Sequence, residues 1–205
     1  SVRVARKGLI NREKTLNFKF DGRNYKGFEG DTVASALLAS GKKVFGRSFK
    51  YHRPRGVLTA GSEEPNALIT VGQGAFQDPN IRATTQEIFE GLVTKSQNNW
   101  PNLQYDILSI NDLFSNFLGA GFYYKTFMWP KSFWEKIYEP FIRRAAGLGA
   151  LSGLHNSDTY EKAYAFCDLL IIGGGPSGLI AAKIAAEAGL DVILAEQEPI
   201  FGGRL

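Results

Sequence analysis

The chain has 205 residues, of which 44% are hydrophobic and 21% charged, proportions typical of globular proteins. Its 24 Lys and Arg residues barely outnumber its 20 Asp and Glu residues and are scattered, which argues against a nucleic-acid-binding surface. One cysteine, Cys167, excludes an internal disulfide, a cysteine-ligated zinc site and a cysteine-ligated iron–sulfur cluster within this chain. No signal-peptide pattern opens the sequence, and the apolar stretch 117–129 is too short to span a membrane. We therefore expect a cytoplasmic protein that binds neither nucleic acid nor membrane.

The first segment, residues 1–76, begins with a pattern typical of a β-hairpin. Residues 15–20 alternate apolar and polar side chains, as a half-buried strand does. Asp21-Gly22 is a hairpin turn signal, and residues 25–28 provide the returning strand.

A helix and a further strand follow the hairpin. Asp31 or Thr32 is expected to cap a helix over residues 33–40, and Gly41 to close it. Residues 67–71 predict another strand. This order of elements predicts a small α+β domain of the β-grasp kind.

Residues 77–158 are predicted to form a mainly helical connecting segment, unusually rich in aromatic residues. Pro130 and Pro140 are expected to divide it into short helices, and the glycine-rich stretch 147–153 to form a flexible linker. A packed layer that covers a neighbouring domain is the favoured interpretation, and a docking surface for a partner chain is the alternative. Its aromatic residues include Phe114, Phe117, Phe122, Tyr123, Tyr124, Phe127, Trp129, Phe133, Trp134, Tyr138 and Phe141.

Residues 159–205 predict the start of an α/β Rossmann-type dinucleotide-binding fold. A short apolar run, residues 168–172, has the composition of a buried parallel strand. It leads into Gly173-Gly-Gly-Pro-Ser-Gly178, and residues 179–188 continue as an Ala-rich helix. The G-x-G-x-x-G spacing therefore has a strand before it and a helix after it, which is the context that this motif requires. A glycine-rich turn that binds nothing is the disfavoured alternative.

Each residue of this motif has an expected task. Gly173 permits the tight turn, Gly175 lets a pyrophosphate approach the backbone, and Gly178 lets the helix pack on the strand. The helix N-terminus offers N–H groups and a positive dipole end to phosphates, and Ser177 adds a donor in the first turn.

An acidic residue follows at the expected spacing. Residues 191–195 predict a second strand, and Glu196 lies at its end, 18 residues after Gly178. A carboxylate at this place accepts hydrogen bonds from a ribose diol and disfavours a 2′-phosphate, so NAD or FAD is expected rather than NADP. Gly202-Gly-Arg204 comes next, a second glycine pair of the kind found in flavoproteins with two dinucleotide-binding domains.

The remaining chemically reactive side chains have structural interpretations. Cys167 is expected to be a small buried residue rather than a nucleophile, because no histidine lies near it in sequence. His155 is expected to be exposed, and His52 to be structural rather than ligand-binding. Arg53 and Arg55, in the same basic turn as His52, could pair with carboxylates of another domain or with a cofactor phosphate.

Four stretches of the chain carry a resemblance to a known family. They are Gly30-Asp-Thr-Val-Ala-Ser-Ala-Leu-Leu-Ala, Arg47-Ser-Phe-Lys-Tyr-His-Arg-Pro-Arg-Gly, Glu63-Glu-Pro-Asn-Ala-Leu and Gly173-Gly-Gly-Pro-Ser-Gly-Leu. The chain resembles the N-terminal part of the alpha subunit of heterotetrameric sarcosine oxidase, and the second and third stretches are the most specific.

The resemblance implies a ferredoxin-like β-grasp domain without its iron–sulfur cluster, since Leu58, Ala60 and Glu64 stand where a ferredoxin has ligand cysteines. It implies NAD at the dinucleotide fold, with FAD as the alternative, and FMN and FAD in the partner beta subunit. Small gamma and delta subunits complete the expected assembly. The expected cofactor-binding residues are Gly173, Gly175, Pro176, Ser177, Gly178, Glu196, Gln197, Gly203 and Arg204.

The family's reaction is the oxidative demethylation of sarcosine to glycine with oxygen and tetrahydrofolate. The resemblance places the catalytic flavin in the beta subunit, so this chain is expected to contain no catalytic residue and no metal site. A β-α-β unit ending at Leu205 lacks further strands, so the chain is expected to be a piece of a longer polypeptide. Two alternatives are an FAD-binding subunit of an opine oxidase or hydrogen cyanide synthase, and a non-catalytic assembly module.

Overall fold

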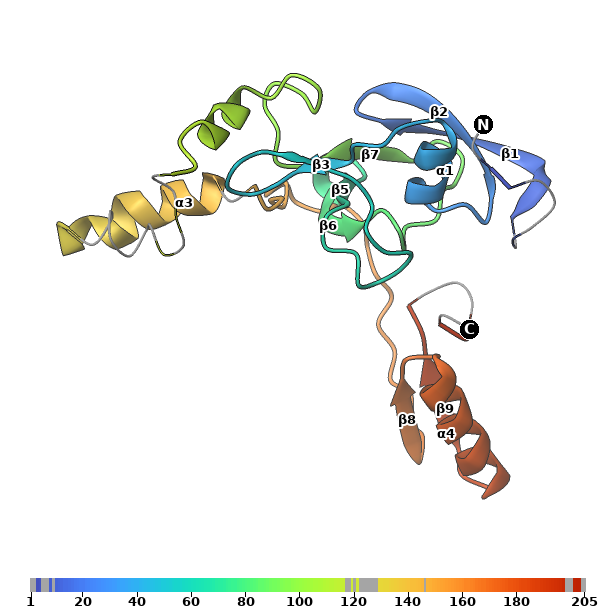
Figure 1. Ribbon diagram of the computed structural model, residues 1–205. Helices are drawn as coiled ribbons and strands as arrows, with labels where there is room; N and C mark the ends of the chain where they lie inside the picture. Colours follow the sequence, from blue (N-terminus) through green and yellow to red (C-terminus); the bar gives the residue numbers. More distant parts are fainter. Residues whose placement is uncertain are drawn as a thin grey trace. The chain divides into compact units, whose positions relative to one another are not determined.

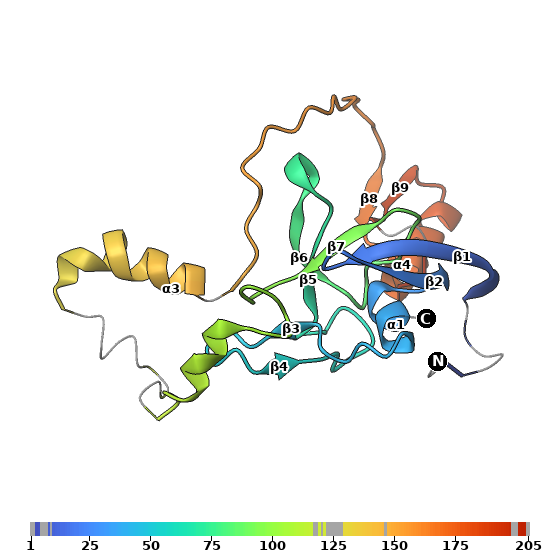
Figure 2. The same cartoon turned by 90° about the horizontal axis from the view of Figure 1, so that it is seen from above.

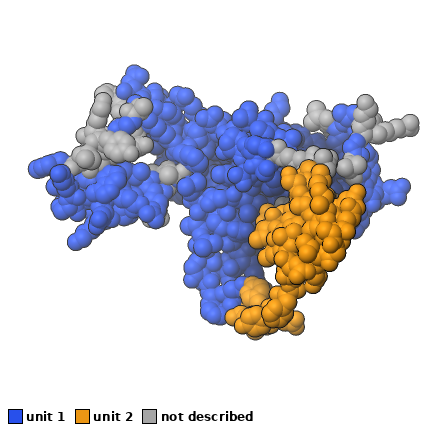
Figure 3. Space-filling model, turned by 90° about the horizontal axis from the view of Figure 1, so that it is seen from below, with its two compact units in different colours: residues 1–157 blue, residues 158–205 orange. Residues whose placement is uncertain are grey.

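The computed structural model divides the chain into two compact units, residues 1–157 and residues 158–205 (Figure 3). The predicted three-part division at residues 76 and 158 stays a prediction. Of the aromatic residues named above, Phe117, Phe122, Tyr123, Tyr124 and Phe127 lie outside the described residues, as does Arg204. The structure describes residues 3, 4, 8, 10–116, 119, 121, 129–145, 147–197 and 201–203.

A mixed five-stranded sheet forms the frame of the first unit (Figure 1). Its strand order is β2-β1-β7-β5-β6, in which β1 and β7 are parallel and the other neighbours antiparallel. The strands are β1 (Asn11–Phe20), β2 (Arg23–Glu29), β5 (Leu68–Val71), β6 (Asp78–Arg82) and β7 (Val93–Ser96).

The predicted hairpin is confirmed. β1 and β2 pair up to Phe20 and Arg23, and the turn between them consists of Asp21 and Gly22. Both turn residues have positive φ, 50° and 75°, which gives a two-residue turn the twist of the strands that it joins.

The predicted helix is α1 (Val33–Ala39), and Thr32 caps it. The Ser35 N–H donates to Thr32 Oγ1 at 3.2 Å and the Thr32 N–H donates to Ser35 Oγ at 3.0 Å, a reciprocal capping box. Gly41 has φ +84° directly after the helix, as a residue closing a helix often does. α1 lies beside β2 in both views (Figures 1 and 2) and buries one apolar face.

The core of the first unit lies between α1, the sheet and the strand pair β3 (Gly46–Arg47) and β4 (Pro54–Arg55). Burial of these apolar side chains is the main source of the unit's stability. The buried cluster consists of Leu16, Phe18, Phe20, Val33, Ala34, Ala36, Leu37, Phe45, Ala67, Ile69, Ala83, Ile88, Leu92 and Leu103.

The sheet extends beyond residue 76, where the sequence predicted the first domain to end, because β6 and β7 belong to it. Helical structure after the short 3-10 turn Gly74–Phe76 begins only at the 3-10 helix Ile107–Asp112. It continues with a 3-10 turn Lys131–Phe133, a π-helix Trp134–Tyr138 and α3 (Glu139–Ala145). Pro140 lies at the second position of α3, which follows the π-helix without a gap, so it does not separate two helices, contrary to the prediction.

Part of the predicted flexible linker packs against the first unit. The Gly149 N–H donates to Asn80 Oδ1 at 3.0 Å. Gly147 and Gly149 have no room for a side chain, because a Cβ would overlap Asn98 and Gln97 respectively. The glycines thus allow a close approach to the end of β7.

The second unit is the predicted strand–helix–strand. β8 (Leu169–Ile172) and β9 (Val192–Ala195) are parallel, and α4 (Pro176–Glu187) connects them. The side chains of Ile172, Ile180 and Ile184 are exposed in the described structure. No helix among the described residues is long and apolar enough to cross a membrane.

Candidate dinucleotide-binding site

The glycine loop, residues 173–178, joins β8 to α4. Gly173 has φ +104°, a conformation that side-chain-bearing residues rarely adopt. The Gly173 N–H donates to the Ala195 carbonyl at 2.8 Å, which fixes the start of the loop to the end of β9. A Cβ on Gly178 would overlap the Gly173 carbonyl, so helix and loop pack as closely as the sequence predicted.

Gly175, in contrast, faces open space. No atom lies within 4 Å of the position that a Cβ would take there. α4 begins directly afterwards, and its first intrahelical bond is donated by Leu179 to the Gly175 carbonyl at 2.9 Å. The N–H groups of Ser177 and Gly178 precede that bond, so they have no acceptor within the helix. An open backbone beside unsatisfied donors is the arrangement that binds a pyrophosphate.

Glu196 lies at the end of β9 and reaches the glycine loop. Its Oε2 accepts from the Gly174 N–H at 2.6 Å, and its Oε1 accepts from the Gln197 N–H at 2.7 Å. Each carboxylate oxygen has a second lone pair and can also accept from a ribose hydroxyl. The structure therefore brings Glu196 and the glycine loop together, as the spacing predicted.

Sequence reasoning missed Gly174 and Phe201. A Cβ on Gly174 would overlap the Phe201 ring and lie 3.1 Å from Glu196 Oε2. The Gly202 N–H donates to the Gly174 carbonyl at 2.8 Å. The run of three consecutive glycines in the sequence was a signal of a structural role for Gly174 as well. Its contacts with residues 196–202, however, form only in the folded chain.

Gly203 also returns to the glycine loop, since a Cβ on it would lie 3.5 Å from Gly175 Cα. The predicted cofactor residues from Gly173 to Gly178, with Glu196, Gln197 and Gly203, thus gather around one loop. Nothing is described for Arg204. The residues present fit the adenosine and pyrophosphate part of a dinucleotide.

In the first unit a buried carboxylate organises the loop before β5. Glu64 is 1% exposed. Its Oε2 accepts from the N–H groups of Leu58 and Thr59, each at 2.7 Å. Its Oε1 accepts from the N–H groups of Asn66 at 2.8 Å and Ala67 at 3.1 Å. We call these four N–H groups the amide nest.

The amide nest shifts the acidity of Glu64. Burial alone raises the pKa of the carboxyl, but the hydrogen bonds from Thr59, Asn66, Leu58 and Ala67 outweigh it. The pKa of Glu64 therefore lies below its ordinary value.

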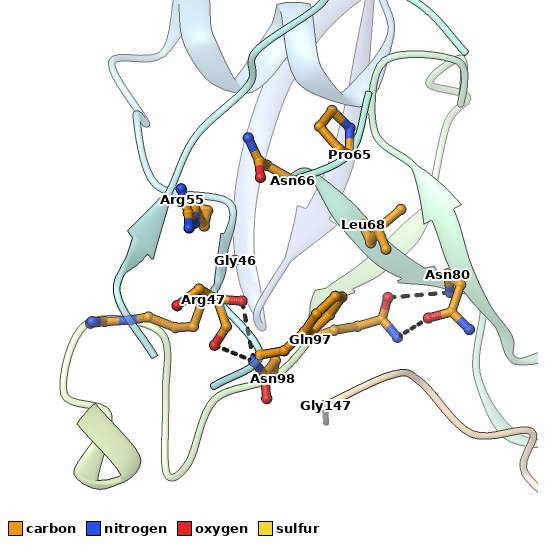
Figure 4. Close-up of a pocket in the computed structure, with 12 residues that line it drawn as sticks. Gly46, Arg47, Arg55, Pro65, Asn66, Leu68, Asn80, Gln97, Asn98 and Gly147 are labelled. Atoms are coloured by element: carbon orange, nitrogen blue, oxygen red, sulfur yellow. Dashed lines mark hydrogen bonds between the residues drawn. The ribbon is translucent and has the colours of Figure 1, made fainter. Parts of the chain in front are cut away.

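The basic turn around His52 is largely structural. His52 is buried, and its Nδ1 lies 2.6 Å from Asp106 Oδ2, which confirms the expectation of a structural histidine. Arg53 pairs with Asp112 at 2.6 Å between exposed side chains. Arg55 is exposed and lines a cavity of about 280 Å³ (Figure 4).

Amide side chains contribute to the lining of this cavity beside apolar ones such as Phe49 and Leu68. Gln97 and Asn80 are hydrogen-bonded to each other, and the Asn98 Nδ2 donates to the carbonyls of Arg47 and Ser48 (Figure 4). The predicted pairing of Arg55 with a carboxylate or phosphate stays a prediction.

Two protein families match separate parts of the chain. Residues 13–99 match the 2Fe-2S iron-sulfur cluster binding domain, and residues 168–205 match the FAD dependent oxidoreductases. The first match contains the five-stranded sheet and the second contains the glycine loop. A ferredoxin-type domain followed by the start of an FAD-dependent dinucleotide-binding region is thereby confirmed.

Curated relatives align with almost the whole chain. Sarcosine oxidase subunit alpha of Rhizobium meliloti (strain 1021) is 60% identical over 205 residues, all of this chain. The subunit of the same name from Corynebacterium sp. (strain U-96) is 33% identical over 199 residues, 96% of the chain. The chain matches the N-terminal part of sarcosine oxidase alpha subunits.

The predicted resemblance to these alpha subunits is therefore confirmed. The chain spans about a fifth of the length of its curated relatives, 21% and 16% for the two just named. A crystal structure of L-proline dehydrogenase from P. horikoshii is 20% identical, covering 94% of this chain and 26% of that one. The TM-score of that match is 0.44.

The residues of the first unit do not fit a [2Fe–2S] cluster. Such clusters are held by four cysteine thiolates, or by two cysteines and two histidines. Residues 13–99 contain no cysteine and a single histidine, His52, which is bonded to Asp106. Within the described part of the chain, no group of three or more His, Cys, Asp or Glu side chains could hold a metal ion.

The prediction of NAD in the dinucleotide fold is wrong. The family that matches residues 168–205 is FAD-dependent, and the comparisons give no support to NAD. The sequence could not distinguish the two because both cofactors contain an adenosine diphosphate with a free ribose diol. In dinucleotide-binding folds, the glycine loop and the acidic residue at the end of the second strand contact only this shared part.

Proposed function

We propose that the second unit holds FAD, and that the complete protein works as the alpha subunit of a multisubunit sarcosine oxidase. The complete enzyme would demethylate sarcosine oxidatively to glycine, with oxygen as electron acceptor and tetrahydrofolate as acceptor of the one-carbon unit. The observation that carries the proposal is the 60% identity, over every residue of the chain, with a sarcosine oxidase alpha subunit. The glycine loop supports a dinucleotide in this unit, and the match of residues 168–205 to the FAD dependent oxidoreductases favours FAD as that dinucleotide.

The cofactor residues have separate roles in this proposal. Gly175 leaves the backbone open to the pyrophosphate, and the N–H groups of Ser177 and Gly178 donate to it. Glu196, already held by the Gly174 N–H, accepts from the ribose diol. Bound FAD supplies a flavin that accepts a hydride or electrons. The further residues proposed to line the site are Gly173, Pro176, Gln197, Gly203 and Arg204.

The first unit serves this protein as a ferredoxin-type domain without a cluster, and other subunits complete the enzyme. No side chain in the described residues is assigned a catalytic role. The chain binds and orients a cofactor, and the groups that touch the amine belong elsewhere in the assembly.

The test uses the complete protein assembled with its partner subunits. Because the beta subunit is also expected to hold FAD, the alpha subunit is separated from its partners, and the flavin that it releases on denaturation is identified by mass spectrometry. Sarcosine-dependent oxygen consumption is measured on the assembly. We expect FAD and turnover of sarcosine. Absence of FAD from this subunit, or oxidation of opines in place of sarcosine, contradicts the proposal.

A substitution tests the residue assignment. Glu196→Ala removes the charge-assisted hydrogen bonds to the ribose and is expected to weaken FAD binding by roughly 1.5–3 kcal/mol. Glu187→Ala, an exposed change at the end of α4, is the matched control and should leave FAD binding unchanged. Equal FAD affinity for both variants would remove Glu196 from the site.

A further inference from the structure

The amide nest has an arrangement that the proposed function does not use. Two consecutive N–H groups, of Leu58 and Thr59, point at one oxygen of Glu64. Two more consecutive N–H groups, of Asn66 and Ala67, point at the other oxygen. The two pairs come from either side of Glu64 in the sequence, so the loop closes around its own carboxylate.

In the described part of the chain, no cation balances this carboxylate. Among the described residues, no Lys, Arg or His side chain forms an ion pair with Glu64. Glu64 is 1% exposed, and its negative charge is stabilised by these four backbone N–H groups together with the Thr59 hydroxyl, which lies 3.4 Å from Oε2. Converging backbone N–H groups form the anion-binding concavities found at phosphate and iron–sulfur sites.

The loop is also fixed from outside the nest. The Thr84 hydroxyl donates to the Gly61 carbonyl at 2.7 Å, and the Glu64 N–H donates to the same carbonyl at 3.1 Å. Only the second bond involves Glu64, through its backbone N–H, and neither bond involves its carboxylate. The loop conformation that brings these N–H donors together is therefore stabilised by the Gly61 bonds as well as by the carboxylate.

We propose that the amide nest is an anion-binding site, occupied in this protein by the Glu64 carboxylate. It takes a small carboxylate from solution when that side chain is shortened. Its ligand class is a planar anion with two oxygens, each of which accepts from one N–H pair. In a ferredoxin-type domain without cysteines, this internal carboxylate supplies the negative charge around which the loop is ordered. The inference does not depend on FAD binding or on the substrate of the enzyme.

Glu64→Ala in the complete protein tests the site, with Glu63→Ala as a matched control in the same loop. Glu63 is exposed, and the four N–H groups of the nest donate to the Glu64 carboxylate. Hydrogen–deuterium exchange of the peptide covering residues 57–67 is measured with sodium formate and with sodium chloride at equal ionic strength. We expect exchange in Glu64→Ala to be faster by about tenfold or more, because four amides lose their acceptor. Formate, but not chloride, should slow it saturably.

Glu63→Ala and the unsubstituted protein should show no such response to formate. Exchange in Glu64→Ala that equals the control overturns the proposal, since the carboxylate would then not order the loop. Faster exchange that formate restores no better than chloride also overturns it, since the nest would then not be an anion site.

If Glu64→Ala does not fold, Glu64→Gln provides a second test of the anion site. Glutamine has the same shape but only one carbonyl oxygen, and its NH₂ group faces N–H donors instead of accepting from them. We expect protection to persist at one pair, Leu58 and Thr59 or Asn66 and Ala67, and to fall at the other. Full protection of all four amides by glutamine contradicts an anion site.

Discussion

Gly173, Gly175 and Gly178 are glycines for three different physical reasons. Gly173 has a positive φ, and Gly178 has the Gly173 carbonyl where a Cβ would lie. Gly175 has neither constraint, since its φ is −71° and its surroundings are open. A glycine that the fold itself does not require is best explained by something that approaches it from outside.

These differences separate cofactor binding from folding. Gly175→Ala should leave far-UV circular dichroism unchanged and weaken FAD binding by about tenfold or more, because the added methyl occupies the open space beside the backbone. Gly178→Ala should disturb α4 as well as FAD binding, since its Cβ overlaps the loop. FAD titration of both variants, with circular dichroism alongside, checks this. Normal FAD affinity in Gly175→Ala would show that the ligand does not approach the loop there.

Single residues were predictable from the sequence where a local rule applies. The spacing from Gly178 placed Glu196 at the end of β9, and the Asp21-Gly22 pair placed the hairpin turn. The contact between Gly174 and Phe201 was not predictable, because it joins a turn to a segment beyond the next strand. The four donors around Glu64 likewise follow from a loop conformation that no periodicity encodes.

The elements of the first unit show the same division between local and non-local information. α1 has a complete capping box and a closing glycine, so its bounds followed from the sequence. β6 (Asp78–Arg82) and β7 (Val93–Ser96) were missed, and both are short with polar residues. Their strand conformation is due to pairing with β5 and β1 rather than to their own composition.

A buried pair joins the basic turn to the segment that follows β7. Asp106 Oδ2 lies 2.6 Å from His52 Nδ1, and Asp106 Oδ1 accepts from the N–H groups of Trp100 at 3.0 Å and Leu108 at 3.2 Å. One carboxylate thus fixes two segments that are distant in sequence. Removing it leaves three buried or half-buried donors without an acceptor.

Asp106→Ala should therefore lower the local free energy of unfolding by about 2–4 kcal/mol. Asp112→Ala breaks the exposed pair with Arg53 and should cost less than about 1 kcal/mol, because water screens that pair. Hydrogen exchange at the Trp100 and Leu108 amides reports the difference. Equal effects of the two substitutions would mean that the buried pair does not hold the segments together.

At the scale of the molecule, folding is sensitive to acid through Asp31 and Glu64, which are the buried ones among the described carboxyls that have a lowered pKa. Burial raises the pKa of Asp31, but hydrogen bonds from Arg3, the Phe28 N–H and Ser35 and the charge of Arg3 bring it below its ordinary value of 3.8. The pKa of Glu64 is likewise below its ordinary value of 4.5. A carboxyl with a lowered pKa in the folded state stabilises the fold above its unfolded pKa, and this contribution is lost as pH falls through the folded pKa.

Urea unfolding at a series of pH values should therefore show stability falling as the pH drops below about 4.5. Glu64→Gln cannot titrate, so its stability should start lower and fall less steeply in this range. An identical slope for both proteins would show that Glu64 has the same pKa folded and unfolded.

The packing of Gly147 against Asn98 has a topological consequence. The chain leaves the end of β7 at Asn98 and is back at the same place at Gly147, so residues 99–146 form an excursion with adjacent ends. Insertions or deletions within such an excursion, outside the stretch around Asp106, do not alter where the chain re-emerges. The place where the chain re-emerges at Gly147 is therefore set by the end of β7, the central strand of the sheet.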